Sequence, residues 1–214
     1  MEIVFCIIPE DRFFKPAAAD VAGILKLLLT EDYVDNDDVY LDIAYDNGHH
    51  RPGASDMTTV ADVLAELEGA DDLELRDFSV ENIRGTTRIP ELFENCDQKN
   101  VSLMGWLAVR VFEEAYPLLD SEEGHRIRCG FCGHEADQQE WTTEGGLWRC
   151  PACDRLEEMH ALDFLPPVEF ARLIIEISDL AFTEAPPRLK QDNEFMGEIS
   201  GILGCELKPV WYRM

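Results

Sequence analysis

In the first part of the chain, apolar residues follow strand and helix patterns in turn. Residues 2–8 form a nearly continuous apolar run, which predicts a buried strand. Residues 16–30 predict a helix, because their apolar positions recur at intervals of three and four residues. Those positions are Val21, Ile24, Leu25, Leu28 and Leu29.

The pattern then returns to strands and a second helix. Residues 39–45 alternate between apolar and polar and predict a strand, with a turn at residues 46–48. Residues 49–56 are polar and contain Pro52 and Gly53, which favours a loop. Thr58 or Thr59 is expected to cap a helix that runs to about Glu68. Residues 73–80 then predict a third strand.

The second half of the chain contains a long segment that is apolar almost throughout. Residues 101–119 are apolar on nearly every side of a helical projection, so we expect a buried central helix. Further along, residues 159–165 predict a strand and residues 166–180 a helix opened by two prolines. Residues 192–203 predict another helix, ended by Gly204, and residues 205–212 a last strand.

These elements predict an α+β fold, in which a mixed β-sheet carries packed helices. Four cysteines interrupt this pattern: Cys129, Cys132, Cys150 and Cys153. They form two C-x-x-C pairs separated by seventeen residues, a spacing that is typical of a metal site with four thiolate ligands. Two intervening residues let both sulfurs of a turn face one ion, so two such turns complete a tetrahedron. Glycines in the first turn and Pro151 in the second suit tight turns.

The two cysteine turns and their flanking residues resemble a zinc ribbon, a module of two knuckles carried on short hairpins. The resemblance covers about residues 123–160 and implies a structural Zn²⁺ bound by Cys129, Cys132, Cys150 and Cys153. We therefore expect a main domain of residues 1–122 and 161–214, with the ribbon inserted at 123–160. Trp141 and Trp148 are expected to cover the site, and His134 to donate to it or to face solvent.

Other interpretations of the cysteines remain open at this stage. An iron site of rubredoxin type uses similar knuckles, and a dithiol redox pair uses the same motif. Four thiolates leave no open coordination position, so a catalytic zinc is disfavoured. Cys6, Cys96 and Cys205 are isolated in or near apolar segments, and we expect small buried residues there rather than reactive thiols.

The charge of the chain narrows the choice of partner. Its 214 residues include 44 acidic and 18 basic residues, a formal net charge of -26. Between Ser121 and His160, nine acidic residues face four basic ones, so the ribbon lacks a basic stripe. Nucleic acids and anionic membranes are therefore unfavourable partners, whereas a basic protein is favourable. The same acidity could also serve solubility alone.

The sequence contains no recognisable catalytic motif, and no apolar run is long enough to span a membrane. Its N-terminus lacks the pattern of a signal peptide, so we expect a cytoplasmic protein. The leading hypothesis is a non-enzymatic, zinc-binding protein that binds a basic protein partner. It would act as an inhibitor, like bacterial immunity proteins or antitoxins. The alternative is a zinc-ribbon accessory subunit of a transcription or RNA-processing assembly.

Overall fold

A computed structural model describes residues 3–45, 50–70, 75–97, 105–120, 124–137, 140, 143–144, 147–183, 186–191 and 194–213. Its main element is a seven-stranded sheet in the order β13-β1-β12-β5-β4-β2-β3. The strands are β1 (Ile3–Pro9), β2 (Asp38–Tyr45), β3 (His50–Thr59), β4 (Leu75–Arg84), β5 (Trp106–Leu118), β12 (Glu169–Ser178) and β13 (Leu207–Arg213). Neighbouring strands pair antiparallel throughout.

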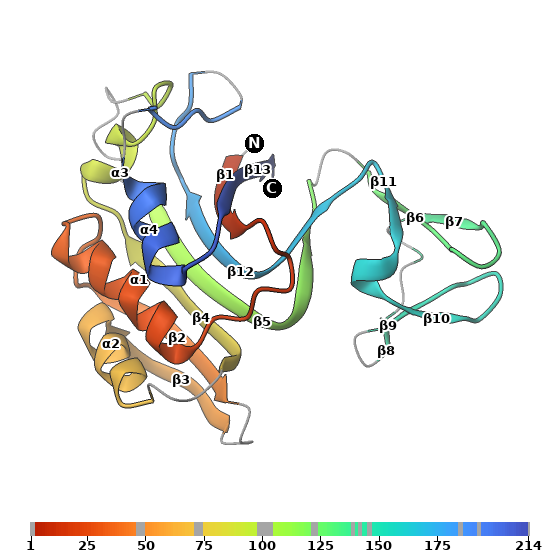
Figure 1. Cartoon of the computed structure of the whole chain (residues 1–214), viewed down its shortest axis with the longest axis horizontal. Helices are drawn as coiled ribbons and strands as arrows, with labels where there is room; N and C mark the ends of the chain where they lie inside the picture. The colour runs from red at the N-terminus through yellow and green to blue at the C-terminus, as the bar shows by residue number, and fades with distance from the viewer. Residues whose placement is uncertain are drawn as a thin grey trace.

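Helices cover one face of this sheet (Figure 1). They are α1 (Ala18–Thr30), α2 (Val60–Glu68), the short α3 (Arg88–Glu91) and α4 (Phe195–Leu203). Their apolar sides and the inward side chains of the strands form the largest core, which contains Ile24, Leu25, Phe93, Val109 and Ile175. The predicted α+β class is thus confirmed. Among the described residues, no helix combines the length and the apolar composition needed to cross a membrane.

The opposite face of the sheet carries a smaller apolar cluster to which only strands contribute. Its buried members come from β1, β5 and β12, and residues of β13 pack against them: Val4, Cys6, Ile8, Leu118, Ala171, Ile174, Phe112, Val210 and Tyr212. On β1, Phe5 and Ile7 face the helices while Cys6 faces the other way. This alternation explains why the predicted first strand has no polar side.

Several predicted elements are confirmed at their expected positions. Helix α2 begins after Thr59, whose backbone N–H donates to Asp62 (3.1 Å) while its hydroxyl accepts from the Asp62 N–H (3.2 Å). This reciprocal pair satisfies two donors that the first turn would otherwise leave free. Helix α4 ends at Gly204, which adopts the left-handed conformation with φ 64°. The strands predicted at residues 39–45, 73–80 and 205–212 correspond to β2, β4 and β13; positions 46–48 and 73–74 lie outside the described residues.

Two predicted helices are strands instead. Residues 101–119 were expected to form a central helix, but the described part forms β5. Residues 166–180 were expected to form a helix, but they contain β12. Each lies inside the sheet, so both of its edges are paired. Consecutive residues of β12 and of the first half of β5 are also buried, which places apolar side chains on both faces there. An apolar run of this kind fits a buried helix and a central strand equally well by its periodicity.

Two smaller expectations also need correction. The loop predicted at residues 49–56 falls largely in β3, an edge strand. An edge strand tolerates Pro52 and Gly53, because one side of its backbone has no strand to pair with. The strand predicted at residues 159–165 is a 3₁₀ turn, η2 (Met159–Ala161), followed by the short β11 (Asp163–Leu165).

A glycine at the entrance to β5 provides a test of this packing. Gly105 has φ +79°, and a Cβ there would lie 2.9 Å from the Leu180 side chain. Gly105→Ala should therefore lower the free energy of unfolding by about 1–3 kcal/mol through backbone strain and overpacking. Gly201→Ala is the matched control, since a Cβ in α4 would meet nothing within 4 Å. It should raise stability by up to about 1 kcal/mol. Urea unfolding would show these opposite signs; equal effects would contradict the packing at Gly105.

Candidate metal centre

The first cysteine turn follows the short strand β6 (Arg126–Arg128) and leads into β7 (Glu135–Asp137). The backbone N–H of Cys129 donates to the carbonyl of His134 (2.8 Å), and the N–H of Gly133 donates to the carbonyl of Cys129 (3.0 Å). Gly133 has φ +74°, a conformation that glycine adopts without steric cost. The turn thus closes tightly enough for Cys129 and Cys132 to face the same point.

The second cysteine turn repeats this geometry position by position. It follows β9 (Leu147–Arg149) and leads into β10 (Leu156–Glu158). The N–H of Cys150 donates to the carbonyl of Arg155 (2.8 Å), and the N–H of Asp154 donates to the carbonyl of Cys150 (2.9 Å). Asp154, at the place equivalent to Gly133, has φ +60°. Two chain segments of different sequence therefore form the same knuckle.

The two knuckles bring all four sulfur atoms together within 4.8 Å of one another. The Sγ atoms of Cys129 and Cys153 are 3.8 Å apart, and those of Cys132 and Cys150 are 3.7 Å apart. A regular tetrahedron with metal–sulfur bonds of about 2.3 Å has sulfur–sulfur edges of roughly 3.8 Å. These distances are far longer than a disulfide bond of about 2 Å. The cluster is therefore arranged as a site that could hold one metal ion.

The thiols themselves show what such an ion would contribute. Burial raises the pKa of Cys129, but hydrogen bonds from the backbone amides of Cys132 and Phe131 outweigh it, so that its pKa is lowered to about 7. The amide of Arg155 favours the thiolate of Cys153, yet burial and the three neighbouring thiols raise its pKa to about 12. One thiolate in this small volume opposes the next, so a cation is needed for all four to ionise near neutral pH.

The cluster lies against a small apolar core that joins the ribbon to the large sheet. Cys129, Cys150 and Trp148 are buried in this core, and Trp148 is fully buried. Ala115 of β5 and Phe170 of β12 belong to the same core. The strand β11, which lies beyond the predicted ribbon boundary at residue 160, pairs with β6. In Figure 1 the ribbon extends from the ends of β5 and β12, away from the helices.

His125 lies where the ribbon joins the large sheet and contacts both connecting segments. Its ring is buried, the backbone N–H of Asp120 donates to Nε2 (3.1 Å), and Nδ1 lies 3.3 Å from the carbonyl of Pro166. An acceptor role for Nε2 leaves the proton on Nδ1, which then donates to Pro166. The segment after β5 and the segment before β12, which connect the ribbon to the sheet, are thus held together by one side chain.

The residues around the sulfurs differ in part from those expected. The group that could hold a metal ion consists of the four cysteines without His134, whose Nε2 is buried and has no hydrogen-bond partner among the described residues. Trp141 lies outside the described residues. The carboxylate of Glu157 was not anticipated: it accepts from the N–H of Gly130 (3.4 Å) and lies 4.0 Å from the sulfur of Cys129. Only the pairing of β10 with β9 places it there, which the sequence alone does not reveal.

The basic residues of the ribbon are engaged with its own side chains. Arg126 and Arg128 both contact Glu135 (2.9 Å each), and Arg149 contacts Asp154 (2.8 Å). The guanidinium of Arg155 lies 4.1 Å from the centre of the exposed Phe131 ring. Within the described part of the ribbon, these contacts leave no basic stripe of the kind that tracks a phosphate backbone.

Comparison with models of protein families, with curated proteins and with solved structures finds no match to this chain. Arguments about its function therefore rest on the geometry and charge described above.

Cys6, Cys96 and Cys205 lie outside the cluster, and burial keeps their thiols protonated. Cys6 is fully buried, and burial together with the nearby Glu176 raises its pKa well above the ordinary value. Burial also raises the pKa of Cys96 and of Cys205, which are partly exposed. A raised pKa keeps the thiol protonated and hence weakly nucleophilic.

Alkylation tests this difference. With iodoacetamide at about pH 8, Cys6 should stay unmodified in the folded protein, because its thiolate fraction is small and its sulfur is buried. In urea the thiol becomes exposed and its pKa returns to about 8.5, so Cys6 should then react fully. Peptide mapping by mass spectrometry gives the extent of reaction. Rapid labelling of Cys6 without denaturant would contradict its described position.

Proposed function

We propose that Cys129, Cys132, Cys150 and Cys153 hold a structural zinc ion, and that the protein binds a basic protein partner without catalysing a reaction. The sulfur–sulfur distances of 3.7 and 3.8 Å carry the first half of this proposal, because they equal the edge of a zinc–thiolate tetrahedron. Zinc would supply cross-linking and charge neutralisation. Four protein ligands would fill its coordination shell, so a substrate or water would have no place on it.

A structural ion also accounts for the small size of the ribbon. Its strands are two or three residues long, and its core buries few large side chains. Domains of this size seldom fold on apolar burial alone. Structural zinc in small modules contributes on the order of 10 kcal/mol to folding, enough to order both hairpins.

The second half of the proposal rests on charge. Acidic residues outnumber basic ones by 44 to 18, so carboxylates remain in excess even if every cation is paired within the chain. Such a field accelerates association with a basic protein and repels nucleic acid. An inhibitor of a basic, nucleic-acid-directed protein, of the immunity or antitoxin type, is the role that best fits this charge.

A second candidate function is favoured by the tips of the ribbon. Phe131 is 65% exposed at the first knuckle, and Leu156 is 41% exposed beside the second. Exposed apolar residues on a rigid module suit docking into a larger assembly, as an accessory subunit would require. Binding through such contacts would persist at high salt, whereas binding through carboxylates would weaken.

Elemental analysis tests the proposed metal. The purified protein should contain about one zinc per chain, and an iron site would instead show visible absorption. Cys150→Ser should reduce the metal content well below one per chain and destabilise the ribbon, because it removes one buried ligand. Cys205→Ser is the control, since Cys205 lies outside the cluster and should leave the metal unchanged. A full-length protein without stoichiometric metal would refute the site.

Salt dependence tests the proposed partner. A partner captured from the host lysate on immobilised protein at about 50 mM salt should be basic, and about 500 mM salt should release it. The same column should not retain RNA, because the acidic field repels phosphates. If the partner stays bound at high salt, the accessory-subunit function is favoured. If it is acidic or neutral, the charge argument is wrong.

A further inference from the structure

The face of the large sheet opposite the helices carries aromatic side chains that water reaches. Tyr40 of β2 is 57% exposed, Trp106 of β5 is 41% exposed and Tyr116 of β5 is 51% exposed. Tyr40 pairs directly with Glu81, and Tyr116 stacks on Phe112, whose ring packs against the apolar cluster on this face. Large exposed aromatics gathered on one face of a sheet commonly mark a binding surface.

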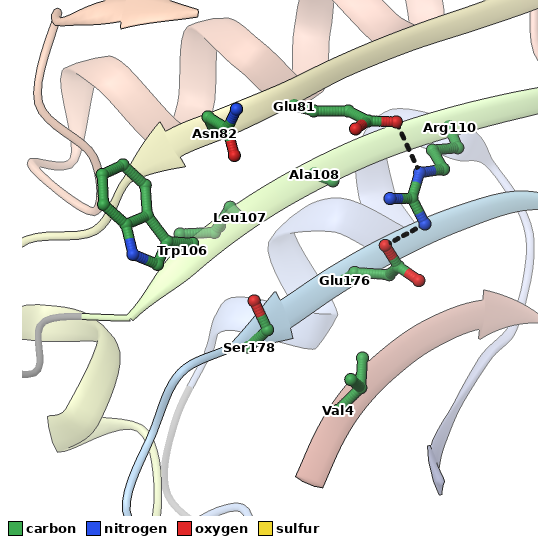
Figure 2. A pocket seen from close by; sticks show the side chains of 9 residues that line it. All are labelled: Val4, Glu81, Asn82, Trp106, Leu107, Ala108, Arg110, Glu176 and Ser178. Carbon is green, nitrogen blue, oxygen red and sulfur yellow. Dashed lines mark hydrogen bonds and ion pairs between the residues drawn. The ribbon is translucent and has the colours of Figure 1, made fainter. Parts of the chain in front are cut away.

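Three charged side chains, Glu81, Arg110 and Glu176, lie on this face along the same strands as Trp106 and its neighbours, as Figure 2 shows. Arg110 donates through Nε to Glu81 (3.0 Å) and through Nη1 to Glu176. The hydroxyl of Tyr212 donates to the second oxygen of Glu176 (2.7 Å). Burial raises the pKa of Tyr212, together with the nearby Cys6 and Glu176, so the hydroxyl stays protonated and keeps donating. Arg110 is thus held in place with its charge already compensated.

The same residues line a small pocket of about 110 Å³ at one end of this face. Trp106 forms one side of it, Glu81 and Glu176 lie along it, and the small side chains of Ala108 and Ser178 leave it open. Glu81 is 41% exposed, and only its Oε1 is engaged with Arg110 among the described residues. Its other oxygen can accept from a further donor.

The charged residues around these aromatic rings favour the binding of a positively charged ligand. Arg84 pairs directly with Trp106 across β4 and β5, and its guanidinium lies near Asp35 (3.8 Å) and Asp37 (3.7 Å). Asp42 and Asp77 are exposed and share the face of Ser79 and Arg110 through strand register. Among the residues whose side chains the structure describes, carboxylates therefore surround Arg84 and Arg110. Asp35 and Asp37 come from the segment just before β2, and Asp42, Asp77, Glu81 and Glu176 come from the strands.

We propose that this face, lined by Tyr40, Glu81, Trp106 and Tyr116, is the docking surface for an arginine- or lysine-rich segment of the basic partner. The proposal rests on the proposed function and names where that function acts. A cationic side chain can lie on the Trp106 ring while Glu81 accepts its hydrogen bonds. Trp106 and Tyr116 pair with Ser178 and Ala171, which are seven residues apart on β12. Their backbone positions are therefore roughly 23 Å apart along the sheet, which suits an extended segment of about seven residues.

The test uses a labelled peptide of about ten residues in which arginine alternates with serine, and a matched peptide with citrulline for arginine. Citrulline keeps the shape of the side chain and removes its charge. At about 50 mM salt, fluorescence anisotropy with the full-length protein should show at least roughly tenfold tighter binding of the arginine peptide. Equal binding of both peptides, or no binding, would overturn this proposal together with the basic-partner function.

Variants on the helix-free face of the sheet and on the ribbon show which of the two surfaces binds the peptide. Trp106→Ala and Tyr40→Ala should each weaken binding by about fivefold or more, because each removes a ring that faces the cations. Phe131→Ala is the control, since it removes a more exposed aromatic ring from the ribbon and should change binding by less than about twofold. Thermal unfolding shows which variants remain folded; Tyr40 projects into solvent, so its substitution should not affect folding.

Two further variants, each of which removes one negative charge, complete the test. Glu81→Gln should weaken binding by about fivefold. Glu206→Gln should have less than about twofold effect, because Glu206 immediately precedes β13 at the end of the sheet far from Trp106. If the arginine peptide binds tightly but only Phe131→Ala weakens it, the docking surface is the ribbon and this proposal fails while the function stands. If Trp106→Ala, Tyr40→Ala and Glu81→Gln all bind like the unaltered protein, the face is also excluded.

Discussion

The antiparallel pairing of β5 with β12 is the constraint on which the rest of the molecule depends. Its register runs from Glu169 opposite Leu118 to Ser178 opposite Trp106. At the first end the two strands lead into the ribbon, so the cluster of four cysteines lies beyond their ends. At the other end, Trp106 and Ser178 line the pocket on the helix-free face. One strand pair thus positions both sites, and a shift in its register would displace both.

The candidate metal centre could be predicted from the sequence because its determinants are local. Each knuckle is closed by hydrogen bonds between residues four and five positions apart, and only the approach of the two knuckles requires the fold. Glu157 and His125 could not be predicted in the same way. Their roles depend on partners that pairing and packing bring together, as with the contact of Glu157 to Gly130.

The central strands show where sequence patterns are ambiguous. Helices α1, α2 and α4 each have one buried side, and their spacing identified them. By contrast, β5 has Leu107, Val109 and Val111 on one face and Ala108 and Phe112 on the other, so apolar residues follow one another. The helix prediction for this segment overlooked the β-branched residues of β12, such as Ile174, Ile175 and Ile177, which favour a strand. Whether such an apolar run forms a helix or a strand depends on its place in the sheet, which the sequence pattern alone does not reveal.

Repulsion between negative groups is a feature of both proposed sites, but its strength differs between them. Inside the ribbon, four thiols within 4.8 Å oppose one another's ionisation, and a bound cation would relieve that repulsion where it is strongest. On the helix-free face, carboxylates such as Asp42 and Asp77 are exposed and screened by water, and the buried Glu176 is paired with Arg110. Their repulsion is tolerated in the free protein and would be relieved by a basic segment. Negative charge would thus be relieved in two ways in the proposed function, by a metal ion among the thiols and by a basic partner at the surface.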